Sequence, residues 1–207
     1  MKMIIDYSSL QFQVAFSDES TFCCINEGHQ RVYRKSSESP HRPEMLSKLI
    51  KHPPKVMIWG IISAHGPGRL HLVEGMMNGV QYNHVIRTRV IPQVTEWYGT
   101  TEDSIFMQDK APCHTAKVNT KALADHGINV LDWPGNSPDL NPIENIWGYM
   151  KRAIASDPPT NRKDLTAKLL KVWFHDPKIK AMCISVVASM PQRLEKVITA
   201  KGGHINY

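Results

Sequence analysis

Short apolar runs separated by turn residues fill the first part of the chain. Between residues 11 and 34 the stretches FQVAF, TFCCIN and RVYRK alternate with the polar segments SDES and EGHQ, a pattern typical of consecutive antiparallel strands. The β-branched and aromatic run KVMIWGIIS (55–63) predicts a buried strand, and the HGPG turn returns the chain into RLHLVEG (69–75). We therefore expect three strands before any long helix.

After the third strand, helical spacing alternates with further strand patterns. The apolar residues predict a helix over 79–98 with a bend or break at Pro92, and SIFMQD (104–109) predicts a second buried strand. Residues 115–127 indicate a helix stopped by a glycine, and INVLDWP (128–134) indicates a strand ended by a proline. Because each of the last two strands is reached through a helix, we expect an α/β fold with a five-stranded mixed sheet flanked by helices.

The remainder of the chain is expected to form a helical C-terminal extension. A loop rich in Pro, Asn, Asp and Ser (134–142) leads into a helix that carries IENIWGYMKRAIAS, and a polar linker follows (157–164). Ser189 and Gln192 match a capping box at the start of the last helix. The apolar stripes of these helices contain Ile146, Trp147, Met150 and Ile154, and then Leu165, Leu169, Val172 and Trp173.

Composition narrows the class of protein. A chain of 207 residues with 42% hydrophobic content is long enough to bury one substantial core. Its apolar runs are far shorter than the ~20 residues of a membrane span, so we expect a soluble intracellular protein without a membrane partner. The four cysteines have no C-x-x-C spacing, which argues against a zinc knuckle or a disulfide framework.

The chain is basic, with a net charge of +6 and a pI near 9.1, as expected for a protein with a polyanionic partner. Much of the excess lies between residues 31 and 55, where KSSESPHRPE also has the composition of a solvated loop. DNA contact and a plain loop therefore stay equally open for this segment. Its charged residues are Arg31, Arg34, Lys35, Arg42, Lys48, Lys51 and Lys55, against Glu38 and Glu44.

Three carboxylates stand where predicted elements begin or end: Asp18 after the first strand, Asp109 at the end of the SIFMQD strand, and Glu144 at the start of a helix. Polar groups at strand ends project into the crevice where α/β folds bind ligands. Three carboxylates brought together repel one another, and a divalent cation relieves this repulsion. Ligation by carboxylates alone suits Mg²⁺ or Mn²⁺ rather than zinc.

Each carboxylate also has an ordinary structural explanation. Asp18 fits a turn residue, and Asp109 fits an Asx-turn before a proline. With Asn141 as N-cap and Pro142 as the first helical residue, Glu144 fits the glutamate of a capping box. Taken one at a time, the structural explanation is the stronger one for each residue, so the inference of a site depends on their combination.

The motif text resembles one family. The strings FSDES, VMIWGIIS, FMQDKAPCHTA, VLDWPGNSPDLNPIENIWGYMKR and SMPQRLEKVITAKGG are similar to the catalytic domain of Tc/mariner transposases, from about Phe16 to the C-terminus. Asp109 and Glu144 are separated by the 34 residues 110–143, the spacing that characterises the Tc branch. The resemblance implies a ribonuclease-H-like fold and an Asp–Asp–Glu triad at Asp18, Asp109 and Glu144.

The resemblance also implies a mechanism. The three carboxylates would hold two Mg²⁺ or Mn²⁺ ions, one lowering the pKa of an attacking water or DNA 3′-hydroxyl and the other stabilising the leaving oxygen. The reactions would be phosphodiester hydrolysis and strand transfer in cut-and-paste DNA transposition. Double-stranded DNA at transposon ends and targets would be the partner, a homodimer the candidate assembly, and the nucleus the place of action.

Weaker candidates surround the triad. His114 matches a histidine of the family motif that would contact a DNA phosphate or orient Asp109, and a structural role at a helix start is equally open. Glu19 should point away from Asp18, because neighbouring residues of a strand face opposite sides. Trp133 and Trp147 are expected in the core. The weaker DNA-contact candidates are His114, Lys110, Arg31, Arg34, Lys35, Lys51 and Lys55.

The expected domain organisation is a linker or remnant over 1–15 and a catalytic domain over 16–207. Residues 1–15 are too few for the paired helix-turn-helix modules of full-length relatives, so the chain is expected to be a fragment, a truncated copy or a domesticated remnant. A catalytically idle DNA-binding or oligomerisation module is the alternative function. A ribonuclease H or integrase on the same fold is disfavoured by the Tc-like motif text.

Overall fold

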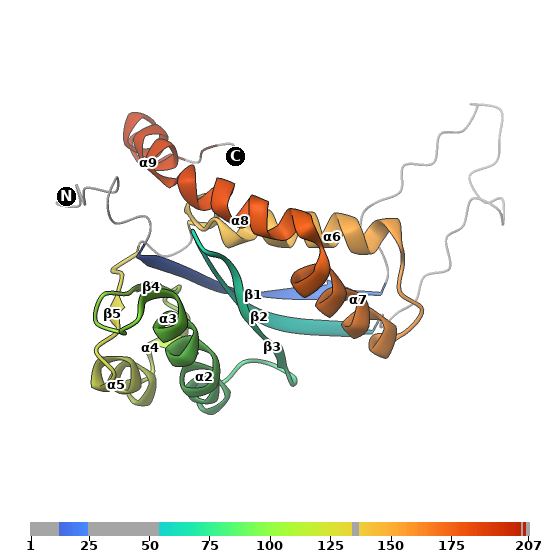
Figure 1. The fold of residues 1–207 in the computed structure, drawn as a ribbon, viewed down its shortest axis with the longest axis horizontal. Coiled ribbons are helices and arrows are strands. Elements are labelled where there is room, and N and C mark those ends of the chain that lie inside the picture. Colours follow the sequence, from blue (N-terminus) through green and yellow to red (C-terminus); the bar gives the residue numbers. More distant parts are fainter. Residues whose placement is uncertain (1–12, 25–53, 134–136, 204, 206–207) are drawn as a thin grey trace.

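The computed structural model describes residues 13–24, 54–133, 137–203 and 205. Its centre is a five-stranded mixed sheet of order β3-β2-β1-β4-β5, which confirms the expected sheet (Figure 1). The first three strands form an antiparallel meander, and the last two run parallel to β1. The strands are β1 (Val14–Cys23), β2 (Lys55–Ser63), β3 (Gly66–Val73), β4 (Ile105–Met107) and β5 (Asn129–Val130).

The first strand differs from its prediction. The segment SDES is part of one ten-residue strand and is not a turn between two strands, so Asp18 lies in the middle of β1 rather than after it. One of the buried polar side chains has a partner on the neighbouring strand. The buried Ser17 hydroxyl donates to the Met107 carbonyl at 3.1 Å, which ties β1 to β4. The expected strand at RVYRK lies outside the described residues.

Helices cover both faces of the sheet (Figure 1). Because side chains alternate along a strand, Phe16 belongs to the core cluster of Trp147, whereas Ala15 belongs to that of Tyr82. One face is covered by α2 (Gly79–Val85), η2 (Ile86–Val90), α3 (Ile91–Tyr98) and α5 (Lys117–Asp125). The other is covered by α6 (Ile143–Ser156), α7 (Arg162–His175) and α8 (Pro177–Ala188), with α9 (Met190–Thr199) at its end.

The helix expected over 79–98 is present, but it is not broken at Pro92. A π-helical segment, η2, joins α2 to α3 immediately before this proline. Proline has no amide hydrogen to donate, and the wider π turn carries the chain past it without ending the helix. A capping box between Asn78 and Gln81 fixes the start of α2.

The last two strands are shorter than expected. β4 covers only Ile105–Met107 of the predicted 104–109, and β5 is a two-residue edge strand within the predicted 128–134. Between them, the short helix α4 (Pro112–Thr115) precedes α5. Gly127 follows α5 with a φ of +68°, so the expected glycine stop is confirmed.

The C-terminal part is helical, as expected. The predicted stripes are buried, except that Val172 is only half-buried, and Trp133 and Trp147 lie in the core. The predicted capping box at Ser189 is wrong. The Ser189 hydroxyl donates to the Val186 carbonyl and accepts from the Arg193 side chain, and it caps no backbone amide of α9. No helix among the described residues is both long and apolar enough to cross a membrane.

Candidate metal and catalytic site

Asp18 and Asp109 come from adjacent parallel strands. Phe16 pairs with Met107 in the register of β1 and β4, and each aspartate lies two residues further along its strand direction. Asp18 lies within β1 and Asp109 lies just beyond the end of β4, and neighbouring strands are roughly 4.8 Å apart, so the two aspartates lie at the same part of the sheet. The Asx-turn explanation of Asp109 holds as well, because the Ala111 amide donates to its Oδ1 at 2.9 Å.

Asp18 is half-buried on the α6 face of the sheet and carries the strongest electrostatic signal of the site. Burial and, after it, the negative charges of Glu144, Glu19 and Asp109 together raise the pKa of its carboxyl to about 8. The carboxyl is therefore largely protonated at pH 7 in the metal-free protein. The cause is a surplus of negative charge in a poorly solvated place, and a bound cation would relieve it.

Glu144 lies exposed in the first turn of α6, and its charge acts on Asp18. The capping-box explanation is wrong. Helix α6 begins at Ile143 with Pro142 as its N-cap, and no side chain caps it. Asn141 fails as the cap because its side chain is buried, with Oδ1 lacking a hydrogen-bond partner.

His114 links Asp109 to a fourth acidic residue. Its Nδ1 lies 2.5 Å from Asp109 Oδ1, and its Nε2 lies 3.2 Å from Glu19 Oε1. The ring is buried and lies against Tyr82, with the ring centroids 4.1 Å apart. Because the ring is buried and both of its nitrogens bond to carboxylates, it is placed to orient Asp109 rather than to reach a phosphate.

The charges of this network are set by its hydrogen bonds. Burial lowers the pKa of His114, but the bonds to Asp109 and Glu19, together with both negative charges, outweigh it and raise the pKa to about 10. The bond from His114 in turn lowers the pKa of Asp109. At neutral pH an imidazolium therefore lies between two carboxylates. Glu19 shares its face with Ala15 and not with Asp18, in line with strand alternation, yet it reaches the site through His114.

The carboxylates influence one another without forming a finished metal cage. Within the described ranges, no group of three or more His, Cys, Asp or Glu side chains is arranged to hold a metal ion. One oxygen of Asp109 is instead directed to His114 and the Ala111 amide. Oxygen donors and surplus negative charge suit Mg²⁺ or Mn²⁺, so the residues fit the implied ions in chemistry.

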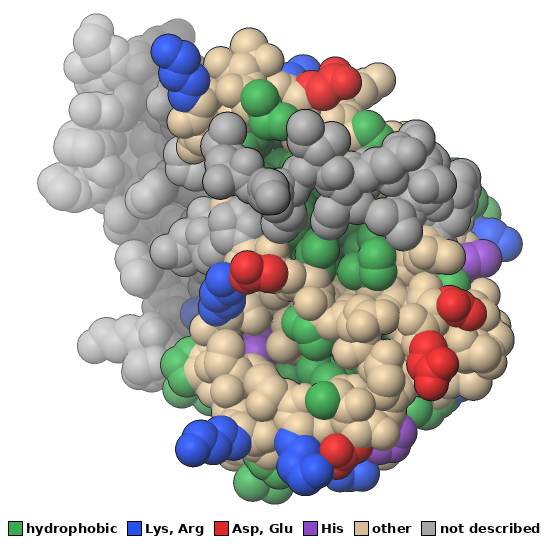
Figure 2. Space-filling view, turned by 90° about the vertical axis from the view of Figure 1, so that its left-hand side faces the viewer, with side chains coloured by type: hydrophobic (Ala, Val, Ile, Leu, Met, Phe, Trp, Pro, Cys, Tyr) green, Lys and Arg blue, Asp and Glu red, His purple; other side chains and the backbone are tan. Residues whose placement is uncertain are grey.

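The weaker DNA-contact candidates are only partly visible. Lys110 donates to Asp132 Oδ1 at 2.9 Å on the surface, and Lys55 begins β2 with an exposed side chain. Figure 2 shows the end of the molecule near α5, where Lys and Arg side chains are interspersed with Asp and Glu on the described surface. The candidates Arg31, Arg34, Lys35 and Lys51 lie outside the described residues.

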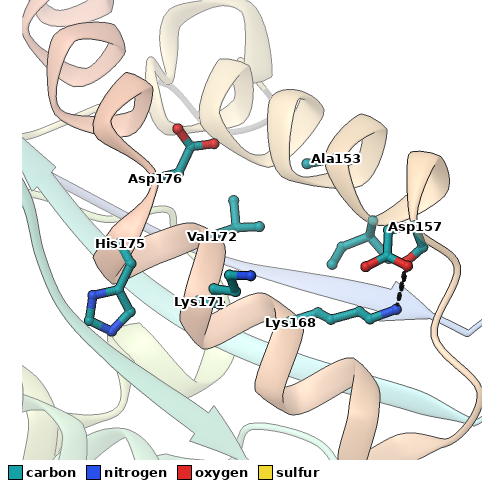
Figure 3. Close-up of a pocket in the computed structure, with 8 residues that line it drawn as sticks. Ala153, Asp157, Lys168, Lys171, Val172, His175 and Asp176 are labelled. Atoms are coloured by element: carbon teal, nitrogen blue, oxygen red, sulfur yellow. Dashed lines mark hydrogen bonds and ion pairs between the residues drawn. The ribbon is translucent and has the colours of Figure 1, made fainter.

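A pocket of about 280 Å³ lies between α6 and α7 (Figure 3). Inside it, Lys168 forms an ion pair with Asp157 at 2.8 Å. The pocket contains none of the predicted site residues, and Lys168, one of its two lysines, already has an acidic partner. It therefore does not compete with the carboxylates as the candidate site. Its lining residues are Ala153, Ile154, Asp157, Lys168, Lys171, Val172, His175 and Asp176.

A mixed sheet of this order, with acidic side chains on two adjacent strands and on the helix packed against them, defines the class of ribonuclease-H-like nucleases. The chain belongs to the DDE superfamily endonucleases, whose family model matches residues 13–166. Its curated relatives include the Tcb1 transposase of Caenorhabditis briggsae, 30% identical over 193 residues, and the Tc1 transposase of Caenorhabditis elegans, 29% identical over 197 residues. Each alignment covers 93% of this chain and 69% of the relative.

Solved structures confirm the fold. The mariner Mos1 paired-end complex with Mn superposes with a TM-score of 0.82 at 18% identity, covering 97% of this chain and 60% of that chain. The complex with Mg gives 0.80 at 18% identity, covering 96% of this chain and 58% of that chain. The ribonuclease-H-like prediction is therefore correct, and the chain spans about three fifths of the Mos1 chains.

Proposed function

We propose that this chain is the catalytic domain of a metal-dependent, cut-and-paste DNA transposase, performing phosphodiester hydrolysis and strand transfer. The observation that carries the proposal is the raised pKa of Asp18, whose causes after burial are the charges of Glu144, Glu19 and Asp109. Three of these four acids are the triad predicted from the motif text. A site that accumulates negative charge beside two adjacent strands is suited to a divalent cation rather than to a covalent protein nucleophile.

In this proposal Asp18, Asp109 and Glu144 hold two Mg²⁺ or Mn²⁺ ions. When bound, the ions activate the attacking water or 3′-hydroxyl and neutralise charge developing at the phosphate. Asp109 is oriented by His114, which Glu19 holds from its other side. Glu144 reaches the site from an exposed helix start, where its carboxylate is accessible to metal and substrate.

The partners follow from the chemistry. We propose that the substrate is double-stranded DNA at transposon ends and targets, bound by a homodimer, and that the protein acts in the nucleus. Support comes from nematode relatives that are transposases and from a neighbour solved as a paired-end complex. We propose the division into a linker or remnant over about 1–15 and a catalytic domain over about 16–207; because Val14 and Ala15 of β1 are buried in the core, these two residues belong with the catalytic domain.

Nicking of supercoiled plasmid DNA by the purified chain tests the proposal. We expect nicking with Mg²⁺ or Mn²⁺, none in EDTA, and none for Asp18→Asn with either metal. The variant should stay folded, and in EDTA it should unfold at a higher temperature than wild type, because it removes a half-buried carboxyl whose ionisation is unfavourable.

The matched control is Asp125→Asn on the exposed part of α5, where the carboxylate pairs with Lys121 one turn earlier in the helix. It should nick as fast as wild type. Metal-independent nicking, or equal rates for Asp18→Asn and wild type, would contradict the catalytic proposal. A folded wild type that binds DNA but never nicks it would favour the idle-module alternative.

A further inference from the structure

A buried arginine in the last helix has no role in the proposed chemistry. Arg193 of α9 is only 2% exposed, and all three guanidinium nitrogens donate hydrogen bonds. Nε donates to Ser189 Oγ at 2.9 Å within the same helix. Nη1 donates to the Asp139 carbonyl at 3.0 Å, and Nη2 donates to Asn145 Oδ1 at 2.7 Å.

The last two contacts bracket the start of α6. Asp139 lies in the turn η3 (Pro138–Leu140) that precedes the helix, and Asn145 is the residue directly after Glu144. Asp139 is held a second time, because its Oδ2 accepts from the Ile205 amide at 3.2 Å. The C-terminal segment therefore forms hydrogen bonds with residues on both sides of Glu144.

Among the described residues, no side chain caps the start of α6, and Glu144 is exposed there, whereas Ile143 beside it is buried in the core. The position of the Glu144 carboxylate therefore depends on how the backbone of this first turn is oriented. The guanidinium of Arg193 is planar, and its two terminal nitrogens bond to η3 and to α6. It therefore fixes the start of the first turn of α6 and the rotation of that turn about the helix axis.

The placement is electrostatically unfavourable in itself. A cation near a helix N-terminus opposes the helix dipole, and burying a guanidinium costs free energy even when it is hydrogen-bonded. An apolar residue of similar size would fill the same space without these costs. A purely space-filling role therefore does not account for an arginine here.

We propose that Arg193 is a positioning residue for Glu144, holding the first turn of α6 so that the carboxylate meets the ions shared with Asp18 and Asp109. The inference rests on the proposed metal-dependent function. It assigns a role in the site to a helix that contributes no carboxylate to it.

The test measures Mn²⁺ dissociation constants by electron paramagnetic resonance. Arg193→Gln should weaken Mn²⁺ binding about 10-fold, as loss of a residue that orients a metal ligand does. Arg193→Lys keeps the charge but not the fork, and it should not restore affinity. Arg162→Gln, on the exposed start of α7, is the matched control and should bind Mn²⁺ like wild type.

A double-mutant cycle separates positioning from general destabilisation. Glu144→Gln should weaken Mn²⁺ binding, and adding Arg193→Gln should then cause no further loss. Equal Mn²⁺ affinity of folded Arg193→Gln and wild type, or additive losses in the cycle, would overturn the inference. Asn145→Ala, at a half-buried residue, breaks the same contact from the other side and decides the question if Arg193→Gln does not fold.

The two proposals fail differently. If wild type neither binds Mn²⁺ nor nicks DNA, the proposed function fails and the positioning role falls with it. If wild type does both, and Arg193→Gln and Asn145→Ala bind Mn²⁺ as tightly as wild type, only the positioning role is wrong.

Discussion

A Cβ atom on Gly60 would lie 2.7 Å from Cη2 of Trp147, so the indole of α6 occupies the space that a side chain on β2 would need. Gly60 pairs with Asp18 in the register of β1 and β2, and Trp147 lies one helical turn after Glu144. This close contact therefore sets the distance between α6 and the sheet beside two of the proposed ligands, Asp18 and Glu144.

Gly60→Ala is expected to destabilise the fold by about 1 to 3 kcal/mol, because Trp147 is fully buried and has no free space to move into. Moving α6 outward would also lower metal-dependent cleavage, since a displacement of about 1 Å at a reacting centre costs roughly 100-fold in rate. Thermal unfolding and nicking rates on the same preparations check both effects.

The control is Gly148→Ala on the same helix, where a new Cβ would come no closer than 3.5 Å to the end of the Arg152 side chain. It should raise stability by up to about 1 kcal/mol through helix propensity and leave nicking unchanged. A Gly60→Ala protein as stable and active as wild type would show that this contact does not set the site.

The fold was predictable from the sequence where periodicity is strong, as in β2 and α6. It was less predictable where polar residues are satisfied by distant partners. SDES has turn composition, but Ser17 bonds to Met107 and Asp18 faces α6, so the strand continues. These contacts join residues far apart in sequence, and local composition does not contain them.

The candidate triad was predictable from the motif text, whereas the hydrogen bond between His114 and Glu19 was not. The sequence placed His114 near Asp109, but not Glu19 on its other nitrogen, because that contact spans 95 positions. Only the adjacency of Glu19 to Asp18 in the DES string was a signal. The burial of Arg193 could not be predicted from the sequence either, because an arginine in an amphipathic helix is usually exposed.

His114→Gln should destabilise the metal-free protein in a pH-dependent way. The folded-state pKa of His114, about 10, lies above its ordinary value of 6.5, so the stabilisation is complete below about pH 6.5 and is lost as the pH rises toward 10. We expect the variant to lose about 2 kcal/mol at pH 6 and much less at pH 10. Urea unfolding in EDTA at both pH values measures the difference.

Exposed His175 supplies the comparison, and His175→Gln should change the free energy of unfolding by less than about 0.5 kcal/mol at either pH. A constant loss for His114→Gln between pH 6 and pH 10 would mean that the ring does not act as a cation between Asp109 and Glu19.

The isolated chain should bind DNA weakly and without sequence preference. We expect its basic 31–55 segment to make phosphate contacts, which would give micromolar or weaker affinity and a steep dependence on salt. Fluorescence anisotropy with two unrelated duplexes would measure the affinity and its salt dependence. Salt concentrations from about 50 to 200 mM cover the range over which phosphate contacts weaken. Replacing Arg34 and Lys35 by Gln should flatten the salt slope by about 2. Tight binding that survives high salt, or a clear preference for one duplex, contradicts this expectation.

Glu144→Gln separates the metal-ligand role of this residue from a structural one. Helix α6 has no side-chain cap and Glu144 is exposed, so both Glu144→Gln and Glu144→Ala should change metal-free stability by less than about 1 kcal/mol, the limit of a helix-dipole contribution. Removing the charge also eases the repulsion that raises the pKa of Asp18. As a ligand, the carboxylate contributes several kcal/mol to the transition state, so either variant should cleave DNA at least about 100-fold more slowly with Mg²⁺. Cleavage rates beside melting temperatures decide the matter, because a Gln variant as fast as wild type would remove Glu144 from the site and leave the two aspartates without a third ligand.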